Sequence, residues 1–224
     1  MNSTVSTQSY VSPWVYPAVR VANRLLLEQI FFRSIRISGE TNLPLQGAAV
    51  LAVKHYSRWD PLLLGLLKRP GLRFMTNANQ FEGIQGWFLR RVGAFAIDLA
   101  RPQKSSIRHF IDLLHQGEAV VIFPEGGIVR DQVLRSLKPG LSRLILQAEA
   151  TASVPLSIPI VPVALRYSPD AERGATVWVD IAPPFFSKDF AADSVKIQAA
   201  QITEHLDRTL RDRLQSLQNI EPER

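Results

Sequence analysis

Short apolar runs alternate with amphipathic segments along most of the chain. Runs with the length and composition of strands occupy residues 34–38, 48–53, 73–76, 94–97, 119–123, 160–165 and 176–181. Helix-start signals or helical spacing of apolar residues predict helices at 61–67, 104–116, 139–152 and 189–217. Strands that alternate with helices predict an α/β domain with a largely parallel central sheet flanked by helices.

The segment 14–32 is apolar but interrupted by charge. Because Arg20, Arg24 and Glu28 fall within it, no window reaches the ~20 apolar residues that cross a bilayer. These three side chains and Asn23 share one side of a helix, so the segment is amphipathic. Such a helix lies in the headgroup layer of a membrane or packs its apolar side on the domain, and amphipathicity does not separate the two.

Two parts of the chain follow from this pattern. We expect residues 1–33 to form an N-terminal tail and an amphipathic helix, which would lie on a membrane surface in the first of these interpretations, and residues 34–224 to form one α/β domain. The first residues, 1–12, are rich in Ser and Thr and lack the basic start and apolar run of a secretory signal.

Composition narrows the chemistry. The chain of 224 residues is 46% hydrophobic, which suits one sizeable core. It has no cysteine, which excludes disulfides and thiolate nucleophiles, and its 4 histidines show no zinc-ligand spacing. The net charge of +6 favours an anionic partner or serves solubility alone. Since Lys and Arg are spread along the chain without stacking aromatics, nucleic acid is not expected.

The stretch after the second predicted strand carries His55 and Asp60, four residues apart, where a strand passes into a helix. A loop end between two rigid elements holds a side chain still and exposed, and histidine suits proton transfer near neutral pH. The same residues also fit a simple helix opening, with Asp60 as a cap and Pro61 at the first position.

A second motif, Phe-Pro-Glu-Gly-Gly, follows the strand at 119–123. Gly126 allows close backbone approach to a ligand, and Glu125 can accept hydrogen bonds from hydroxyl groups, although an ordinary turn has the same composition. Basic residues also follow predicted strands or open a helix. Arg101 and Arg130 can grip a phosphate, and Lys138 precedes a helix whose N-terminus can hold an anion.

The order of these motifs is more specific than any one of them. His-x4-Asp, Gly-x-Phe-x-Ile-Asp, Phe-Pro-Glu-Gly and a Pro-Ile-Val-Pro strand, between about 48 and 165, resemble the motif blocks of the glycerolipid acyltransferases, the family of 1-acylglycerol-3-phosphate acyltransferase. The family usually has Asn where Lys54 stands. It also usually has Arg directly after the Asp of its second block, and Thr-Arg where Gly127 and Ile128 follow Gly126.

The resemblance implies transfer of a fatty acyl group from acyl-coenzyme A or acyl-carrier protein to the hydroxyl of a lysophospholipid. It implies His55 as general base, Asp60 as its orienting acid, and Glu125, Gly126 and an arginine of the second block as acceptor-binding groups. No metal or cofactor is expected, and Ser57 leaves a covalent route formally open.

The expected acceptor is 1-acyl-sn-glycerol 3-phosphate, and the expected location is the cytoplasmic face of a membrane, peripheral or monotopic. Three alternatives remain at this point. They are the same chemistry on glycerol 3-phosphate, a neutral lysolipid or a glycolipid; a non-catalytic lipid-surface binding protein; and a basic nucleic-acid binder.

Overall fold

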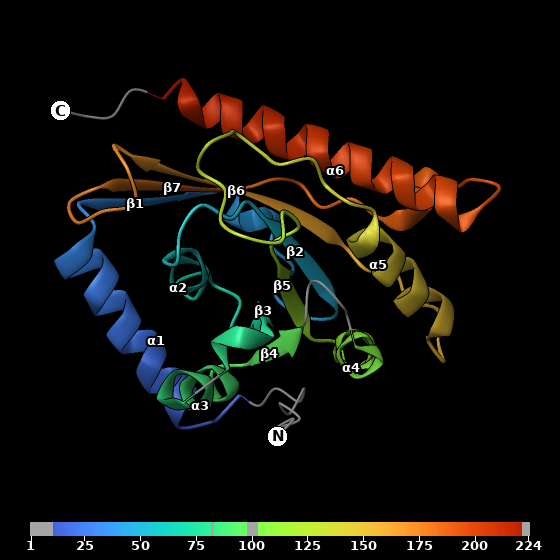
Figure 1. The fold of residues 1–224 in the computed structure, drawn as a ribbon, viewed down its shortest axis with the longest axis horizontal. Coiled ribbons are helices and arrows are strands. Elements are labelled where there is room, and N and C mark those ends of the chain that lie inside the picture. The colour runs from blue at the N-terminus through green and yellow to red at the C-terminus, as the bar shows by residue number, and fades with distance from the viewer. Residues whose placement is uncertain (1–10, 82, 98–102, 221–224) are drawn as a thin grey trace.

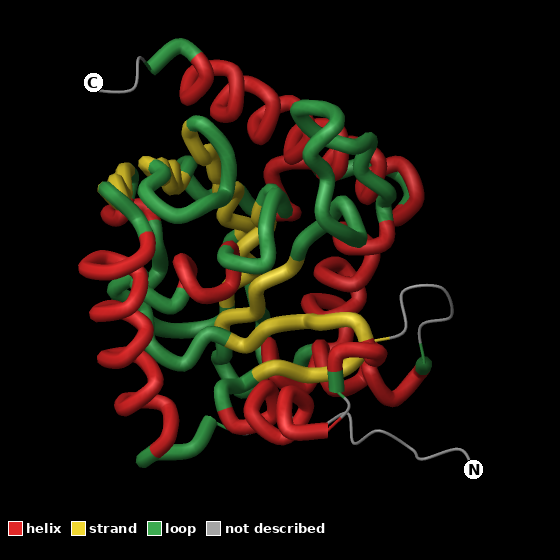
Figure 2. Tube along the Cα trace, turned by 60° about the vertical axis from the view of Figure 1, so that its left-hand side comes forward, coloured by secondary structure: helices red, strands yellow, loops and turns green. Residues whose placement is uncertain are grey.

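The computed structural model of the protein describes residues 11–81, 83–97 and 103–220. Its strands form one central sheet with helices on both sides (Figures 1 and 2). The strands are β1 (Ser34–Ser38), β2 (Ala49–Val53), β3 (Arg73–Asn77), β4 (Ala94–Ile97), β5 (Ala119–Ile122), β6 (Ile160–Ser168) and β7 (Thr176–Ile181). The α-helices are α1 (Val15–Leu25), α2 (Asp60–Leu64), α3 (Gly83–Arg91), α4 (Lys104–His115), α5 (Gly140–Thr151) and α6 (Val195–Gln218). A π-helical segment (Leu26–Phe31) extends α1, and short 3-10 turns lie at Glu40–Asn42, Ala78–Gln80 and Ser187–Phe190.

The strand order across the sheet is β1-β7-β6-β2-β5-β3-β4. Neighbouring strands are parallel except for β6 and β7, which a short loop joins as an antiparallel pair. The prediction of a largely parallel, helix-flanked sheet is therefore confirmed. Each expected strand is present, with ends within one or two residues except for β6, which continues to Ser168.

Both faces of the sheet are buried along its central strands, as is typical of parallel sheets. Along β2, Val50 and Ala52 face the cluster formed with α4, α5 and α6, whereas Ala49, Leu51 and Val53 face the cluster that contains α2 and Leu27. Figure 1 shows α6, α5 and α4 on one side of the sheet and α1, α2 and α3 on the other. This continuous apolar composition is why the strands were predictable from the sequence.

The last helix starts later than its periodicity predicts. The predicted helix spans 189–217, but α6 begins at Val195. Asp189 instead accepts from the backbone N–H of Phe186 in a separate 3-10 turn, and Ser194 is extended and caps the N–H of Ile197. Local capping therefore divides a segment that the apolar stripe alone would join.

The N-terminal helical segment, 15–31, exposes a large part of its apolar surface and is held to the domain partly by polar side chains. Asn23 is buried and donates to the carbonyl of Leu62 at 2.7 Å, and Arg20 donates to the carbonyl of Leu67 at 2.8 Å. The exposed apolar side chains are Trp14, Val21, Leu25, Leu26 and Ile30. Within the segment 14–32, Leu27 and Phe32 are buried in the core, so the segment packs part of its apolar surface on the domain and leaves part exposed, and the membrane-surface role stays a prediction. In the part of the chain that is described, no helix is long and apolar enough to cross a membrane.

Candidate functional site

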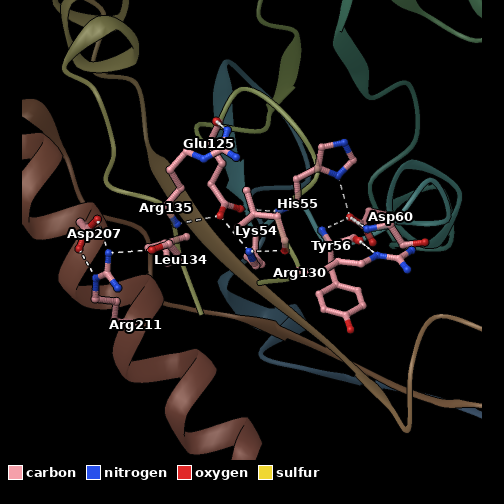
Figure 3. Close-up of polar contacts among 12 residues, drawn as sticks. Lys54, His55, Tyr56, Asp60, Glu125, Arg130, Leu134, Arg135, Asp207 and Arg211 are labelled. Atoms are coloured by element: carbon pink, nitrogen blue, oxygen red, sulfur yellow. Dashed lines mark hydrogen bonds and ion pairs between the residues drawn. The ribbon is translucent and has the colours of Figure 1, made fainter. Parts of the chain in front are cut away.

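His55 and Asp60 form a hydrogen-bonded pair at the end of β2. Nδ1 of His55 lies 2.8 Å from Oδ2 of Asp60, the first residue of α2. Asp60 is fully buried, whereas the His55 side chain is 17% exposed. Because a carboxylate only accepts, Nδ1 carries the proton and Nε2 keeps its lone pair. In Figure 3 the ring of His55 lies on the side of Asp60, away from the side chains of Lys54 and Glu125.

Asp60 accepts further hydrogen bonds from its own loop and from β6. The backbone N–H groups of Tyr56 and Ser57 donate to Oδ2 at 2.7 and 2.8 Å, and the hydroxyl of Tyr167 donates to Oδ1 at 2.5 Å. These donors stabilise the ionised carboxylate despite its burial. Asp60 is therefore both the orienting group for His55 and the residue that shapes the loop between them.

Phe123 supports the other side of the imidazole. Its ring stacks on His55 with a centroid separation of 4.0 Å and an interplanar angle of 22°. Phe123 follows β5, which is paired with β2 in parallel register, so the two strands deliver both rings to the same edge of the sheet. The imidazole is thus held by a hydrogen bond and by packing.

Glu125 does not face a ligand space. Its side chain is fully buried, and its Oε1 lies 2.8 Å from Nζ of Lys54, which is also buried. Oε1 also accepts from the backbone N–H of Arg135 at 3.0 Å, and Oε2 accepts from the backbone N–H of His55 at 2.9 Å (Figure 3). The structure thus places Glu125 under the main chain of His55 and outside the cavity lining, and its contact with the acceptor stays a prediction.

Lys54 is the partner that sequence reasoning missed. Its ammonium group also donates to the carbonyl of Val129 at 3.0 Å, so it ties β2 to the loop after β5. A buried lysine and a buried glutamate compensate each other's desolvation only when they meet. The signal was present in the motif itself, as a lysine between an apolar run and His55, but its partner lies 71 positions away.

An apolar cavity of about 470 Å³ begins at His55. It lies between α1 and α2 on one side and the strands β3 and β4 on the other, and Gly126 and Gly127 contribute to its lining. Its wall includes Val19, Leu62, Phe74, Met75, Ile97 and Phe123. Gly126 has a φ of 74°, a conformation that favours glycine. It also lines the cavity, which is where the sequence predicted it.

Ser57 is not placed for covalent chemistry. Its side chain is buried, its Oγ accepts from the backbone N–H of Trp59, and it is absent from the cavity lining. Ser57 is therefore not positioned to act as a nucleophile toward a molecule in this cavity.

The basic residues of the prediction are dispersed. Arg130 donates from Nε to the carbonyl of Tyr56 at 3.1 Å and lies 3.7 Å from Asp170, outside the cavity lining. Lys138 is exposed just before α5 and is also not part of that lining. Arg101 falls outside the described residues. The described cavity wall contains two arginines that were not selected from the sequence, Arg20 and Arg58.

The site thus combines three features: a largely parallel sheet, a His–Asp pair where β2 passes into α2, and an adjoining apolar cavity. Together with the motif order, they indicate an acyltransferase. The acyltransferase family profile matches residues 34–166. The chain belongs to this family, as the motif order predicted, and it is an O-acyltransferase.

The relatives within the family are named for one reaction. A 1-acyl-sn-glycerol-3-phosphate acyltransferase of Bacillus subtilis (strain 168) is 28% identical over 183 residues, which is 80% of this chain and 87% of the relative. An enzyme of the same name from Streptococcus pneumoniae is 32% identical over 80 residues, covering 34% of this chain and 30% of the relative.

A solved structure has the same fold. The crystal structure of the 1-acyl-sn-glycerophosphate acyltransferase PlsC from Thermotoga maritima matches with a TM-score of 0.70 at 16% identity, covering 93% of this chain and 80% of that chain. This likeness confirms the α/β architecture.

Proposed function

We propose that the enzyme transfers a fatty acyl group from a thioester to the free hydroxyl of 1-acyl-sn-glycerol 3-phosphate, giving phosphatidic acid. The observation that carries this proposal is the His55–Asp60 pair at the mouth of an apolar cavity. The names of the relatives support the acceptor. The donor is acyl-coenzyme A or acyl-carrier protein, and no metal or cofactor is required.

His55 acts as the general base. Nε2 takes the hydroxyl proton as the oxygen attacks the thioester carbonyl, while Asp60 stabilises the imidazolium that forms. The C–O bond then forms, the C–S bond breaks, and the proton passes from the imidazolium to the leaving thiolate. The stacked ring of Phe123 and the buried carboxylate of Glu125 keep Nε2 in place during these steps.

The cavity holds an acyl chain. Its volume falls in the ~300–1,000 Å³ typical of small-molecule sites, and its wall is mainly apolar. Holding two reactants in line is worth about 7–11 kcal/mol, whereas a general base contributes roughly 100- to 10,000-fold. Binding in this cavity is therefore at least as important to the rate as His55.

The phosphate of the acceptor lies beside the loop between His55 and Asp60. Arg58 belongs to that loop and lines the cavity, so it is our first assignment for the phosphate. Arg130, which rests on Tyr56 and Asp170, is the second cation on this side. Arg101 and Lys138 remain predicted anion-binding residues.

The outward apolar side of α1 rests on the membrane. Trp14, Leu25 and Ile30 are 85%, 56% and 57% exposed, which is costly in water and suits the headgroup layer. The opposite side of the same helix contributes Tyr16, Val19 and Arg20 to the cavity. This arrangement supports a peripheral location on a membrane, where a lysophospholipid can pass from the bilayer to His55. The cytoplasmic face is part of the proposal and rests on the family resemblance.

The test is thioester consumption by purified protein on vesicles, with acyl-coenzyme A and acyl-carrier protein offered separately. With 1-acylglycerol 3-phosphate as acceptor we expect turnover, and His55→Ala should lower it about 100- to 10,000-fold. Turnover that persists in His55→Ala would refute the mechanism.

A parallel assay with monoacylglycerol in place of the phosphorylated acceptor tests the substrate. Faster turnover of the neutral lipid would refute the assignment of the acceptor and leave the acyl transfer itself in place.

A further inference from the structure

Asp60 is held on both of its carboxylate oxygens. Oδ2 accepts from His55 and from two backbone N–H groups, whereas Oδ1 accepts from the hydroxyl of Tyr167. Asp60 is fully buried, so water cannot take the place of the phenol. The contact at Oδ1 is therefore the means by which a residue outside the His-x4-Asp motif acts on the pair.

Tyr167 is itself held rigidly. It lies near the end of β6 and pairs in register with Val177 of β7. Its ring is buried, stacks on Tyr56 at 5.3 Å, and meets Phe32 at 5.9 Å. The sheet and these rings leave the hydroxyl one position, opposite Asp60 (a residue 107 positions away).

The surroundings of Tyr167 also favour the protonated phenol. Burial raises the pKa of Tyr167, and the neighbouring charge of Asp60 raises it further. A protonated hydroxyl at this distance donates to Oδ1 of Asp60.

We propose that Tyr167 is a positioning residue for acyl transfer, which acts through Asp60 to hold His55 in line and to set how readily its imidazole takes a proton. This inference rests on the proposed role of His55 as general base. A hydrogen bond at Oδ1 disperses the carboxylate charge and so weakens its attraction for an imidazolium. Without that bond, the full charge of Asp60 faces His55, and the imidazole keeps its proton to higher pH.

The first test needs no substrate. NMR titration of the His55 ring, assigned by comparison with His55→Ala, is run on the wild type and on Tyr167→Phe. We expect the midpoint to rise by about one pH unit in Tyr167→Phe, because one hydrogen bond to the carboxylate is lost. An unchanged midpoint would refute the proposal and reduce Tyr167 to a packing residue.

Tyr56→Phe is the matched control. Its hydroxyl donates to Asp170 at 2.9 Å and its ring packs on Tyr167, but the side chain does not touch Asp60. The His55 midpoint should therefore stay at the wild-type value in this variant, whatever happens to its melting temperature. An equal rise in both variants would show a general effect of lost tyrosine hydroxyls, and would overturn the proposal.

The second test is kinetic. In Tyr167→Phe the acid limb of the pH profile of kcat/KM should move upward with the NMR midpoint, and kcat should fall about tenfold with little change in the KM of the acceptor. A rise in KM alone would contradict positioning. If neither variant nor wild type turns over the acceptor, the NMR result still decides the role of Tyr167, while the proposed function fails separately.

A graded replacement covers the case in which Tyr167→Phe does not fold. Difluorotyrosine placed at position 167 keeps the ring and the hydroxyl but makes the phenol a stronger donor. The His55 midpoint should then fall below the wild-type value. A rise, or no change, would refute the proposal.

Discussion

Lys54 and Glu125 show how much one buried contact can decide at the scale of single residues. Each carries a charge into the interior, and each is compensated by the other and by backbone groups. The exposed pair Lys68–Glu40 has the same separation of 2.8 Å, but the Lys68 side chain is 69% exposed. Distance alone therefore does not rank the two pairs, since burial determines what is lost when one partner is removed.

The prediction at this scale concerns Lys54→Met. Removal of the ammonium group leaves the carboxylate of Glu125 buried without its counter-ion, so the free energy of unfolding should fall by about 3–5 kcal/mol. Urea denaturation measures the loss. Lys68→Met is the control and should change stability by less than about 1 kcal/mol, because its charge is solvated. Similar losses in the two variants would contradict a buried, compensated pair.

At the scale of elements, α1 is unusual because its polar residues hold it to the domain. Asn23 and Arg20 donate to carbonyl groups within α2 and just after it, and Leu27 continues the contact from the π-helical segment. Several of its apolar side chains, among them Val21 and Leu25, are left at the surface. Hydrogen bonding thus determines which side of an amphipathic helix faces inward.

The prediction for α1 is a selective loss of membrane binding. Leu25→Ser combined with Ile30→Ser should weaken co-sedimentation with anionic vesicles roughly tenfold or more, since each exposed side chain contributes about 1 kcal/mol on entering an apolar phase. Thermal stability should change little, because both side chains are exposed in the folded protein.

Leu27→Ser is the contrasting variant for this helix. Leu27 is fully buried, so its replacement should lower the free energy of unfolding by about 2–5 kcal/mol instead. Vesicle binding that is unaffected by the outward pair would argue against the proposed membrane side of α1.

At the scale of the whole molecule, α6 lies along the sheet on the side away from α1 (Figure 1). Its apolar residues complete the core cluster that α4 and α5 form with the sheet. His205 on this helix packs against Phe185 and Phe190, with ring centroids 4.6 and 5.1 Å away. His115 likewise contacts the carbonyl of Ala148 at 2.8 Å, which links α4 to α5. His205 is therefore half-buried by aromatic rings, whereas His115 stays exposed although its ring contacts α5.

The packing of His205 predicts a pH dependence of stability. Burial lowers the pKa of His205 in the folded protein, with a further lowering by Arg208 and an opposing effect of Asp189. In the unfolded chain His205 has the ordinary histidine pKa of about 6.5, so below that pH the unfolded state binds more protons than the folded state. The stabilisation is therefore complete above about pH 6.5 and declines as the pH falls.

Melting temperatures between pH 7.5 and 5 test this expectation. His205→Phe keeps the aromatic contact and cannot take up a proton, so it should show a smaller decline than the wild type. An equal decline in both proteins would assign the pH dependence to other groups, such as His109, whose pKa is also lowered by burial.

The chain pattern alone was enough for the sheet and for the central pair. Parallel strands are buried on both faces, so their composition is continuous and legible. His55 and Asp60 lie within one short loop, so local spacing brings them together without help from distant parts of the chain. The position of Gly126 beside the site could also be predicted, because its turn directly follows β5, and β5 pairs with β2.

What only the tertiary structure decided are the contacts between segments far apart in sequence. Three contacts depend on a partner from another element. They are the ion pair between Lys54 and Glu125, the hydrogen bond from Tyr167 to Asp60, and the hydrogen bond from Asn23 to Leu62. Period and composition state that a side chain is polar or apolar, but they do not state which partner satisfies it. Hydrogen bonding and charge compensation are settled by position in space, and that position exists only once the sheet has assembled.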